Sequence, residues 1–233
     1  MAQRHPKARR TRKQTKDDGE DAFIAGILDF SNWAKENQQV LTVAGIVAVI
    51  LVAGGLYYAS YRSQLSEQAT EQLETIYQSV GINDIEGAKV DLATFLDRFA
   101  GTPYEAEARL LLGELYLESG EPQQAMAVLD PIGASPRAAI EFQAAFLLAG
   151  AYEQEERWAE AEAAYLRIAD RSELGFQVRD ALASAARIRA EQLNNPQGAI
   201  ELYQQVLAQL EENAPERGRY EMRIQEIRSA QNI

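Results

Sequence analysis

The stretch AEARLLLGELYLESGEPQQAMAVLDPI, residues 106–132, decides the fold because its pattern returns 36 residues further along the chain. The second copy, residues 142–168, reads FQAAFLLAGAYEQEERWAEAEAAYLRI. Apolar residues recur in both copies at spacings of three and four, and a short polar segment interrupts each copy near its middle. This repetition predicts pairs of helices joined by tight turns and stacked along the chain. The fold class expected is all-α.

Side-chain size varies within the copies in the way that stacked helix pairs require. Small residues are expected where the two helices of a pair approach closely, at Gly113, Ala125, Ala149, Ala161 and Ala199. Large residues are expected to fill the space between pairs, and these are Tyr116, Leu129, Tyr152, Tyr165 and Tyr203. Weaker copies are recognisable at residues 85–99 and 194–209, and an amphipathic segment at 219–231 suits a closing helix.

Helix boundaries carry recognisable signals. TPYE, SPRA and NPQG place Thr102, Ser135 and Asn195 directly before a proline, which predicts three capped helix starts. The segment SGEP predicts that one helix ends at Gly120 and that the next begins at Pro122.

The motif L-G-x-x-Y at Leu112, Gly113 and Tyr116, with Ala125 nine residues later and then Leu129, resembles the tetratricopeptide repeat pattern. The resemblance is close over residues 106–175 and looser over 66–105 and 176–212. It implies a helical-pair solenoid whose first helices form a partner-binding groove. The groove residues carried over are Glu107, Leu110, Glu114, Leu117 and Glu118 in one repeat and Gln143, Phe146, Gly150, Glu153 and Gln154 in the next.

Such a groove would be acidic with apolar patches, which suits a basic amphipathic segment of a partner or an unfolded client protein. For Leu110 and Phe146 the alternative is packing against neighbouring helices.

A second decisive stretch, residues 37–61, has no charged side chain. It could be a soluble core helix, a cleaved signal or a membrane anchor. A soluble helix would show a polar face, and a signal sequence has a shorter apolar region nearer the start of the chain. The 20 residues from Val40 to Ala59 would span roughly 30 Å as a helix, the thickness of the hydrocarbon core. We therefore expect a transmembrane helix over residues 38–61.

Charges around this stretch predict its orientation. Seven Lys or Arg residues lie within residues 1–16, whereas Arg62 is the only basic residue between the apolar stretch and Lys89. Positive residues favour the cytoplasmic side. Residues 1–20 are accordingly expected to form a basic cytoplasmic tail, residues 21–36 an amphipathic juxtamembrane helix on the lipid bilayer, and residues 62–233 an extracytoplasmic repeat domain.

Several kinds of chemistry are disfavoured. The chain has no cysteine and its one histidine is His5, so the repeat region has no His or Cys ligands or nucleophiles. Residues 62–233 hold 15 basic and 29 acidic side chains, a balance that repels nucleic acid. Glu155 with Glu156, or Glu160 with Glu162, could form a catalytic carboxylate pair, but charges of this kind are ordinary on solvated helix faces. We expect no enzyme activity, no cofactor and no metal.

The whole layout resembles one bacterial family, the ancillary SecYEG translocon subunit family. The features in common are a basic tail, the amphipathic ILDFSNWAKEN (residues 27–37), a single span and an acidic repeat domain directly after it. The resemblance implies an inner-membrane protein with a periplasmic C-terminal domain. Its implied partners are Sec translocon subunits, a membrane-anchored periplasmic chaperone of the prolyl isomerase type, and unfolded clients. The residues leave two alternatives open, a repeat adaptor for another envelope assembly complex, serving the outer membrane or the cell wall, and an anchored enzyme.

Overall fold

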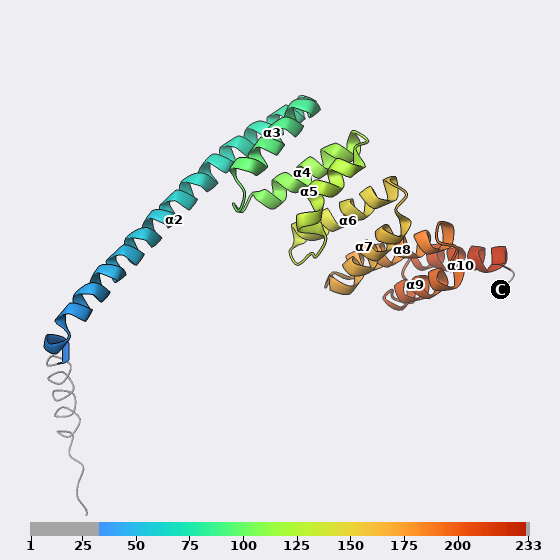
Figure 1. Ribbon diagram of the computed structural model, residues 1–233. Coiled ribbons are helices and arrows are strands. Elements are labelled where there is room, and N and C mark those ends of the chain that lie inside the picture. The colour runs from blue at the N-terminus through green and yellow to red at the C-terminus, as the bar shows by residue number, and fades with distance from the viewer. Residues whose placement is uncertain (1–32, 232–233) are drawn as a thin grey trace, which may run out of the picture. The chain divides into compact units, whose positions relative to one another are not determined.

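The computed structural model describes residues 33–231, which contain helices and no strand. Figure 1 shows the helices following one another along the chain. Their bounds are α2 Gln38–Gly81, α3 Ile85–Arg98, α4 Glu105–Glu118, α5 Pro122–Gly133, α6 Ala139–Gln154, α7 Trp158–Arg171, α8 Gly175–Glu191, α9 Pro196–Ala208 and α10 Arg217–Gln231. The all-α prediction is confirmed for this part of the chain.

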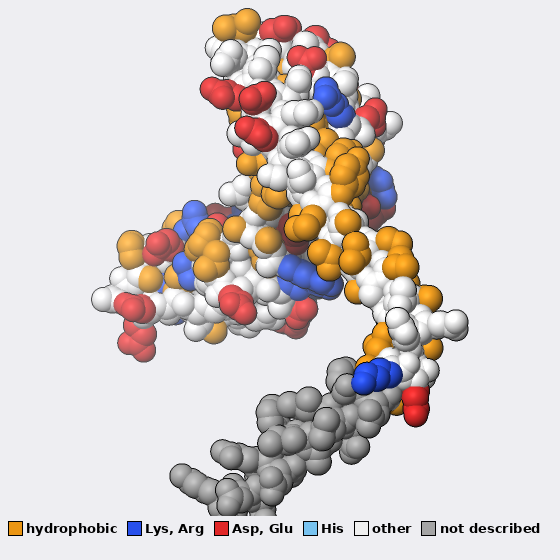
Figure 2. Space-filling model, turned by 90° about the vertical axis from the view of Figure 1, so that its left-hand side faces the viewer, with side chains coloured by type: hydrophobic (Ala, Val, Ile, Leu, Met, Phe, Trp, Pro, Cys, Tyr) orange, Lys and Arg blue, Asp and Glu red, His pale blue; other side chains and the backbone are white. Residues whose placement is uncertain are grey.

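The chain divides into two compact units, one ending at Tyr61 and the other beginning at Arg62. In the first unit, the described residues include the apolar part of α2, whose 18-residue apolar window has no buried residue. Figure 2 shows hydrophobic side chains along this helix. Within residues 33–231, α2 alone is long and apolar enough to cross a membrane. The predicted basic tail and residues 21–32 of the predicted amphipathic helix lie outside the described residues.

In the second unit the helices form pairs with one recurring turn. Each turn contains one residue with a positive φ, between 47° and 73°, namely Asn83, Gly120, Glu156 and Asn194. These residues follow one another at intervals of 37, 36 and 38 residues. At the first three turns the next residue donates its backbone N–H to the carbonyl five positions earlier, over 2.8 to 2.9 Å. This is the bond that closes a Schellman motif. The repeated turn therefore defines four helix pairs, α2–α3, α4–α5, α6–α7 and α8–α9.

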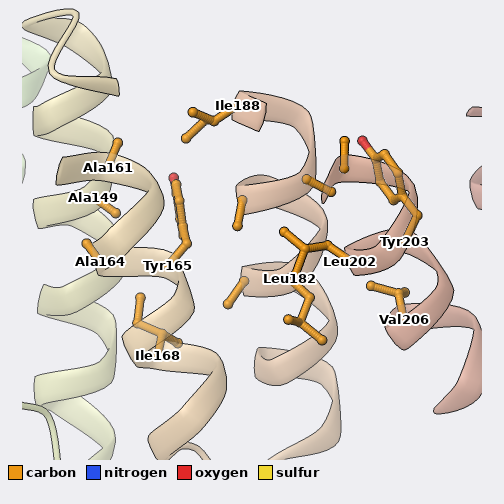
Figure 3. Close-up of a cluster of buried hydrophobic side chains, with 14 of the residues drawn as sticks. Ala149, Ala161, Ala164, Tyr165, Ile168, Leu182, Ile188, Leu202, Tyr203 and Val206 are labelled. Atoms are coloured by element: carbon orange, nitrogen blue, oxygen red, sulfur yellow. The ribbon is translucent and has the colours of Figure 1, made fainter. Parts of the chain in front are cut away.

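Buried side chains form a continuous series of clusters between the pairs. The largest cluster joins α6 to α10 and includes Tyr165 and Tyr203, both less than 10% exposed. Figure 3 shows small side chains where α6 meets α7, at Ala149 and Ala161, and larger ones, Leu182 and Leu202, where α8 meets α9. The small residues expected within a pair are confirmed for α6 and α7, whereas Leu182 and Leu202 are large residues within the pair α8–α9.

Gly113 shows why one crossing requires its small residue. The glycine is buried on α4, and a Cβ placed there would come within 2.5 Å of Leu129 Cγ and Cδ2 on α5. Leu129 is itself fully buried. The absence of a side chain at Gly113 thus allows α4 and α5 to pack at this distance.

Two of the predicted helix starts are wrong. α4 begins at Glu105, because the Thr102 hydroxyl donates to the Phe99 carbonyl, and the Glu105 carboxylate accepts from the Gly101 N–H at 2.6 Å. The carboxylate of Glu141 likewise caps the backbone before α6, where it accepts from the Arg137 N–H at 2.7 Å. This contact replaces the expected Ser135 cap.

The other boundary predictions are confirmed. The Asn195 side chain accepts from the Gly198 N–H at the start of α9, and Pro122 is the first residue of α5. α10 packs against α9, as a closing helix should. Tyr220 and Ile224 of α10 are buried in the cluster that contains Tyr203.

Candidate protein-binding face

The residues predicted to line a groove lie on α4 and α6, which contact each other. We call the surface formed by the first helices of successive pairs, α4, α6 and α8, and by the closing helix α10 the first-helix face. Of the predicted residues, Glu114, Glu118, Gln143 and Gln154 are exposed, and Glu107, Leu110, Leu117, Phe146, Gly150 and Glu153 are half-buried.

The three apolar members of this set also pack against the core. Leu110 and Leu117 contact the buried cluster that contains Leu129. The ring centroid of Phe146 lies 6.1 Å from that of Tyr165, within the range of a favourable aromatic pair. These side chains stabilise the stack and leave only part of their surface available to a partner.

Polar bonds join successive first helices side by side. The Tyr77 hydroxyl at the end of α2 donates to Glu107 on α4 at 2.7 Å. Glu153 on α6 accepts from Arg187 on α8 at 2.6 Å, and from the Tyr165 hydroxyl at 2.8 Å. The carboxylates of Glu107 and Glu153 therefore already have hydrogen-bond partners within the domain.

The same type of bond continues from α8 to α10, where Arg223 pairs with Glu191. The groove predicted from the sequence ended at α6 and did not include Arg187, Glu191 or Arg223. The spacing of 34 residues between Glu153 and Arg187, and of 32 between Glu191 and Arg223, is close to the repeat length and was the available signal.

These contacts shift the proton affinity of the tyrosines. Burial and the neighbouring Glu107 carboxylate raise the pKa of Tyr77 to about 12. Burial is also the main cause of the raised pKa of Tyr165, and the Glu153 carboxylate adds to it. Both hydroxyls therefore remain protonated donors at neutral pH.

Glu114 and Glu118 differ from the glutamates just described. No ion pair or side-chain hydrogen bond is recorded for either of them within residues 33–231. Partial burial, and secondarily the charge of Glu118, raises the pKa of the Glu114 carboxyl. One repeat further along, the position equivalent to Glu114 is Gly150, where an added Cβ would meet no atom within 4 Å. The face therefore exposes the acidic side chains of Glu114 and Glu118 on α4, and it has free space next to Gly150 on α6.

Charge changes along the first-helix face. α4 carries four glutamates and one arginine, and α6 carries two glutamates and no basic residue. α8 carries three arginines against two acidic residues, and α10 carries four arginines against two glutamates. The helices that form the face therefore carry a net negative charge at α4 and α6 and a net positive charge at α8 and α10.

The carboxylate pairs considered for catalysis have ordinary partners. Glu155 accepts from Gln123, Glu160 pairs with Arg157, and Glu162 pairs with Arg189. Hydrogen bonds from Arg157 are the largest cause of the lowered pKa of Glu160. Among residues 33–231, no group of three or more His, Cys, Asp or Glu side chains is arranged to hold a metal ion.

Comparison with known proteins agrees with this architecture. The sequence model of a family described as a tetratricopeptide repeat-like domain matches residues 31–229. A Podospora anserina structure, described as the nearly identical TPR-like repeats of a kinesin light chain, superposes with a TM-score of 0.55 at 20% identity. The alignment covers 72% of this chain and 88% of that one, and it shows similarity of fold. No curated protein matches the sequence.

Proposed function

Because this chain belongs to the tetratricopeptide repeat-like domain family, we propose that it is a membrane-anchored scaffold whose first-helix face binds a segment of a partner protein. Repeats of this type typically form protein-interaction surfaces without catalytic chemistry. The observation that carries the proposal is the pair Glu114 and Glu118, which is exposed on the first-helix face and has no recorded ion-pair partner in the described chain.

The expected occupant is a basic amphipathic segment. Its Lys or Arg side chains would pair with Glu114 and Glu118, and its apolar side chains would contact the exposed parts of Leu117 and Phe146. Glu107 and Glu153 are already bonded within the domain, so they would shape the face more than they would attract the partner.

The proposed anchor is the apolar part of α2, residues 38–61, with residues 1–20 in the cytoplasm, 21–36 on the membrane surface and 62–233 in the periplasm. The apolar window in α2 and the basic residues before it support this topology. Protease added to spheroplasts should then degrade a tag placed after Ile233. A tag that survives until the membrane is permeabilised would contradict the orientation.

We further propose that the partners belong to protein translocation across the bacterial inner membrane, namely Sec translocon subunits, a membrane-anchored periplasmic prolyl isomerase-type chaperone, and emerging clients. The resemblance in layout supports this assignment. Affinity purification of the tagged protein in mild detergent should enrich these proteins. Enrichment of a different envelope complex in their place would support the adaptor role in outer-membrane or cell-wall assembly.

Binding by the face can be tested directly with the full-length protein in a nonionic detergent. A fluorescein-labelled amphipathic helix rich in lysine should bind, and the variant Glu114→Lys/Glu118→Lys should bind it at least ten times more weakly, because attraction becomes repulsion. Glu201→Lys and Glu212→Lys change exposed glutamates outside α4 and α6 and, combined, provide the control for net charge. Equal loss in both double variants would indicate a nonspecific charge effect and contradict the proposal.

A further inference from the structure

A pocket of about 560 Å³ lies between α8, α9 and α10, at the basic end of the first-helix face. Its wall includes Arg187 from α8, Tyr203 from α9, and Arg219, Tyr220 and Arg223 from α10. This volume falls within the usual range for sites that hold small ligands or a few residues of a peptide.

The three arginines of this pocket are not equivalent. Arg187 is paired with Glu153, and Arg223 is paired with Glu191 and with Glu226. For Arg219, no carboxylate partner is recorded in the part of the chain that the structure describes. Arg219 is therefore the arginine whose charge remains available to a ligand.

Arg219 is nonetheless held in a defined position. Its Nη2 donates to the Tyr220 hydroxyl at 2.7 Å, and its guanidinium carbon lies 4.7 Å from the centroid of the Tyr220 ring. Tyr220 is buried and fixes this arrangement. A guanidinium has five N–H donors, so the contact with Tyr220 leaves donors for an anion without a large cost of ordering the side chain.

Tyr203 supplies a second donor at the base of the pocket. Burial raises the pKa of this tyrosine, so its hydroxyl keeps its proton at neutral pH. The neighbouring Arg223 guanidinium acts in the opposite direction and offsets part of the rise in this pKa. Because a guanidinium has no acceptor, Arg223 cannot take up the hydroxyl proton of Tyr203, and this proton can be donated to a ligand.

The remaining wall residues define the ligand further. Arg187, Arg219 and Arg223 exceed the two acidic wall residues, Asp180 and Glu226, by one charge, although the whole chain has a net charge of -12. Ala183 and Met222 add apolar surface, and Met222 is 64% exposed. An anion with a short apolar stem, such as a glutamate side chain, matches this combination better than a bare inorganic anion.

We propose that this pocket binds the carboxylate side chains of an acidic peptide segment in a partner protein, with Arg219 as the main cationic contact and Tyr203 as a neutral donor. This site goes beyond the proposed function, because the acidic surface on α4 and α6 selects segments of the opposite charge. A partner that carries a basic stretch and an acidic stretch would engage both ends of the first-helix face and would be bound in one direction only.

The test uses the full-length protein in nonionic detergent and a fluorescein-labelled peptide Gly-Leu-Glu-Glu-Leu-Glu-Gly with an amidated C-terminus. We expect binding that weakens as salt is raised and that is lost when the three glutamates become glutamines. Arg219→Gln should weaken binding about tenfold, the effect of losing one charged hydrogen bond. Arg228→Gln removes an equal charge from the same helix outside the pocket and should leave binding unchanged.

Met222→Glu provides a second variant at an exposed position, and it should weaken binding by placing a negative charge at the pocket. Equal binding by Arg219→Gln and Arg228→Gln would overturn the proposal. So would a requirement for a free terminal carboxylate in place of the glutamates, or tighter binding of dihexanoyl phosphatidylglycerol than of the peptide. Glu114→Lys should leave the acidic peptide unaffected, so failure of this proposal and failure of the proposed basic-peptide site can be distinguished.

Discussion

Replacing Gly113 with alanine adds one methyl group where α4 crosses α5. The new Cβ would lie 2.5 Å from Leu129 Cγ and Cδ2 and 2.8 Å from its Cδ1. Leu129 is fully buried, so it can move only by displacing other core atoms. Overpacking of this kind costs roughly 1–3 kcal/mol, whereas replacing a helical glycine with alanine gains about 1 kcal/mol. The expected net loss in the free energy of unfolding is about 1 kcal/mol.

Gly150 provides a matched control one repeat further along. It also lies within a first helix, but an added Cβ there would meet no atom within 4 Å. Gly150→Ala should therefore gain the helix propensity without the clash and stabilise the domain by about 0.5–1 kcal/mol. The two substitutions are chemically identical, so the difference of about 2 kcal/mol measures the packing at the crossing of α4 and α5.

The assay is urea unfolding of the full-length protein in nonionic detergent, followed by circular dichroism at the helical band. A double-mutant cycle adds Leu129→Ala, which alone should cost about 2–5 kcal/mol. The double variant Gly113→Ala/Leu129→Ala should lose less free energy of unfolding than the sum of the two single losses. The difference should be at least about 1 kcal/mol, because alanine at position 129 removes the clash. A Gly113→Ala variant as stable as Gly150→Ala would refute the close approach of these helices.

Three further predictions concern the turns and the ionisable groups. Glu156 has a φ of 55°, a conformation costly for a residue with a Cβ, so Glu156→Gly should raise the thermal midpoint, whereas Gly120→Ala at the equivalent turn should lower it. The pKa of Glu114 is raised, so its contribution favours the folded state below its ordinary pKa of 4.5 and is lost as pH rises through the folded-state pKa. Glu114→Gln should therefore raise the urea midpoint at pH 7 and have no effect near pH 3, and an equal effect at both pH values would contradict this cause. For Tyr77, the stability that depends on its proton is intact below pH 10 and lost as pH rises through about 12, so Tyr77→Phe should show a smaller loss over that interval in alkaline titrations followed by circular dichroism, and an unchanged loss would exclude Tyr77 as the titrating group.

The fold was predictable because its main determinants are local and repeated. The spacing of small and large residues predicted the helix pairs, although Leu129, which was expected between pairs, also meets Gly113 within one pair. Helix starts were less predictable, because Thr102 and Ser135 have the side chains of caps but precede helices that begin three or four residues later. The carboxylates Glu105 and Glu141 reach back to the backbone instead, and which of two capping groups prevails depends on how the preceding loop packs.

The turn residues were missed for a related reason. Glycine signals a left-handed turn, and Gly120 was recognised, but Glu156 adopts the same conformation because the flanking helices α6 and α7 impose it. The pocket at α10 was also missed, since it depends on how a helix from the end of the chain lies against Tyr203, a contact that repeat spacing does not encode.

We propose that the first-helix face binds partner proteins beside the membrane. Site-specific photocrosslinking in cells tests it most directly, with the crosslinker placed at Glu114 on α4 and, as a control, at Gln124, an exposed residue on α5 of the same helix pair. We predict adducts with Sec translocon subunits or the periplasmic chaperone from position 114, and none from position 124. The same adducts from both positions, or adducts from position 124 alone, would contradict the claim.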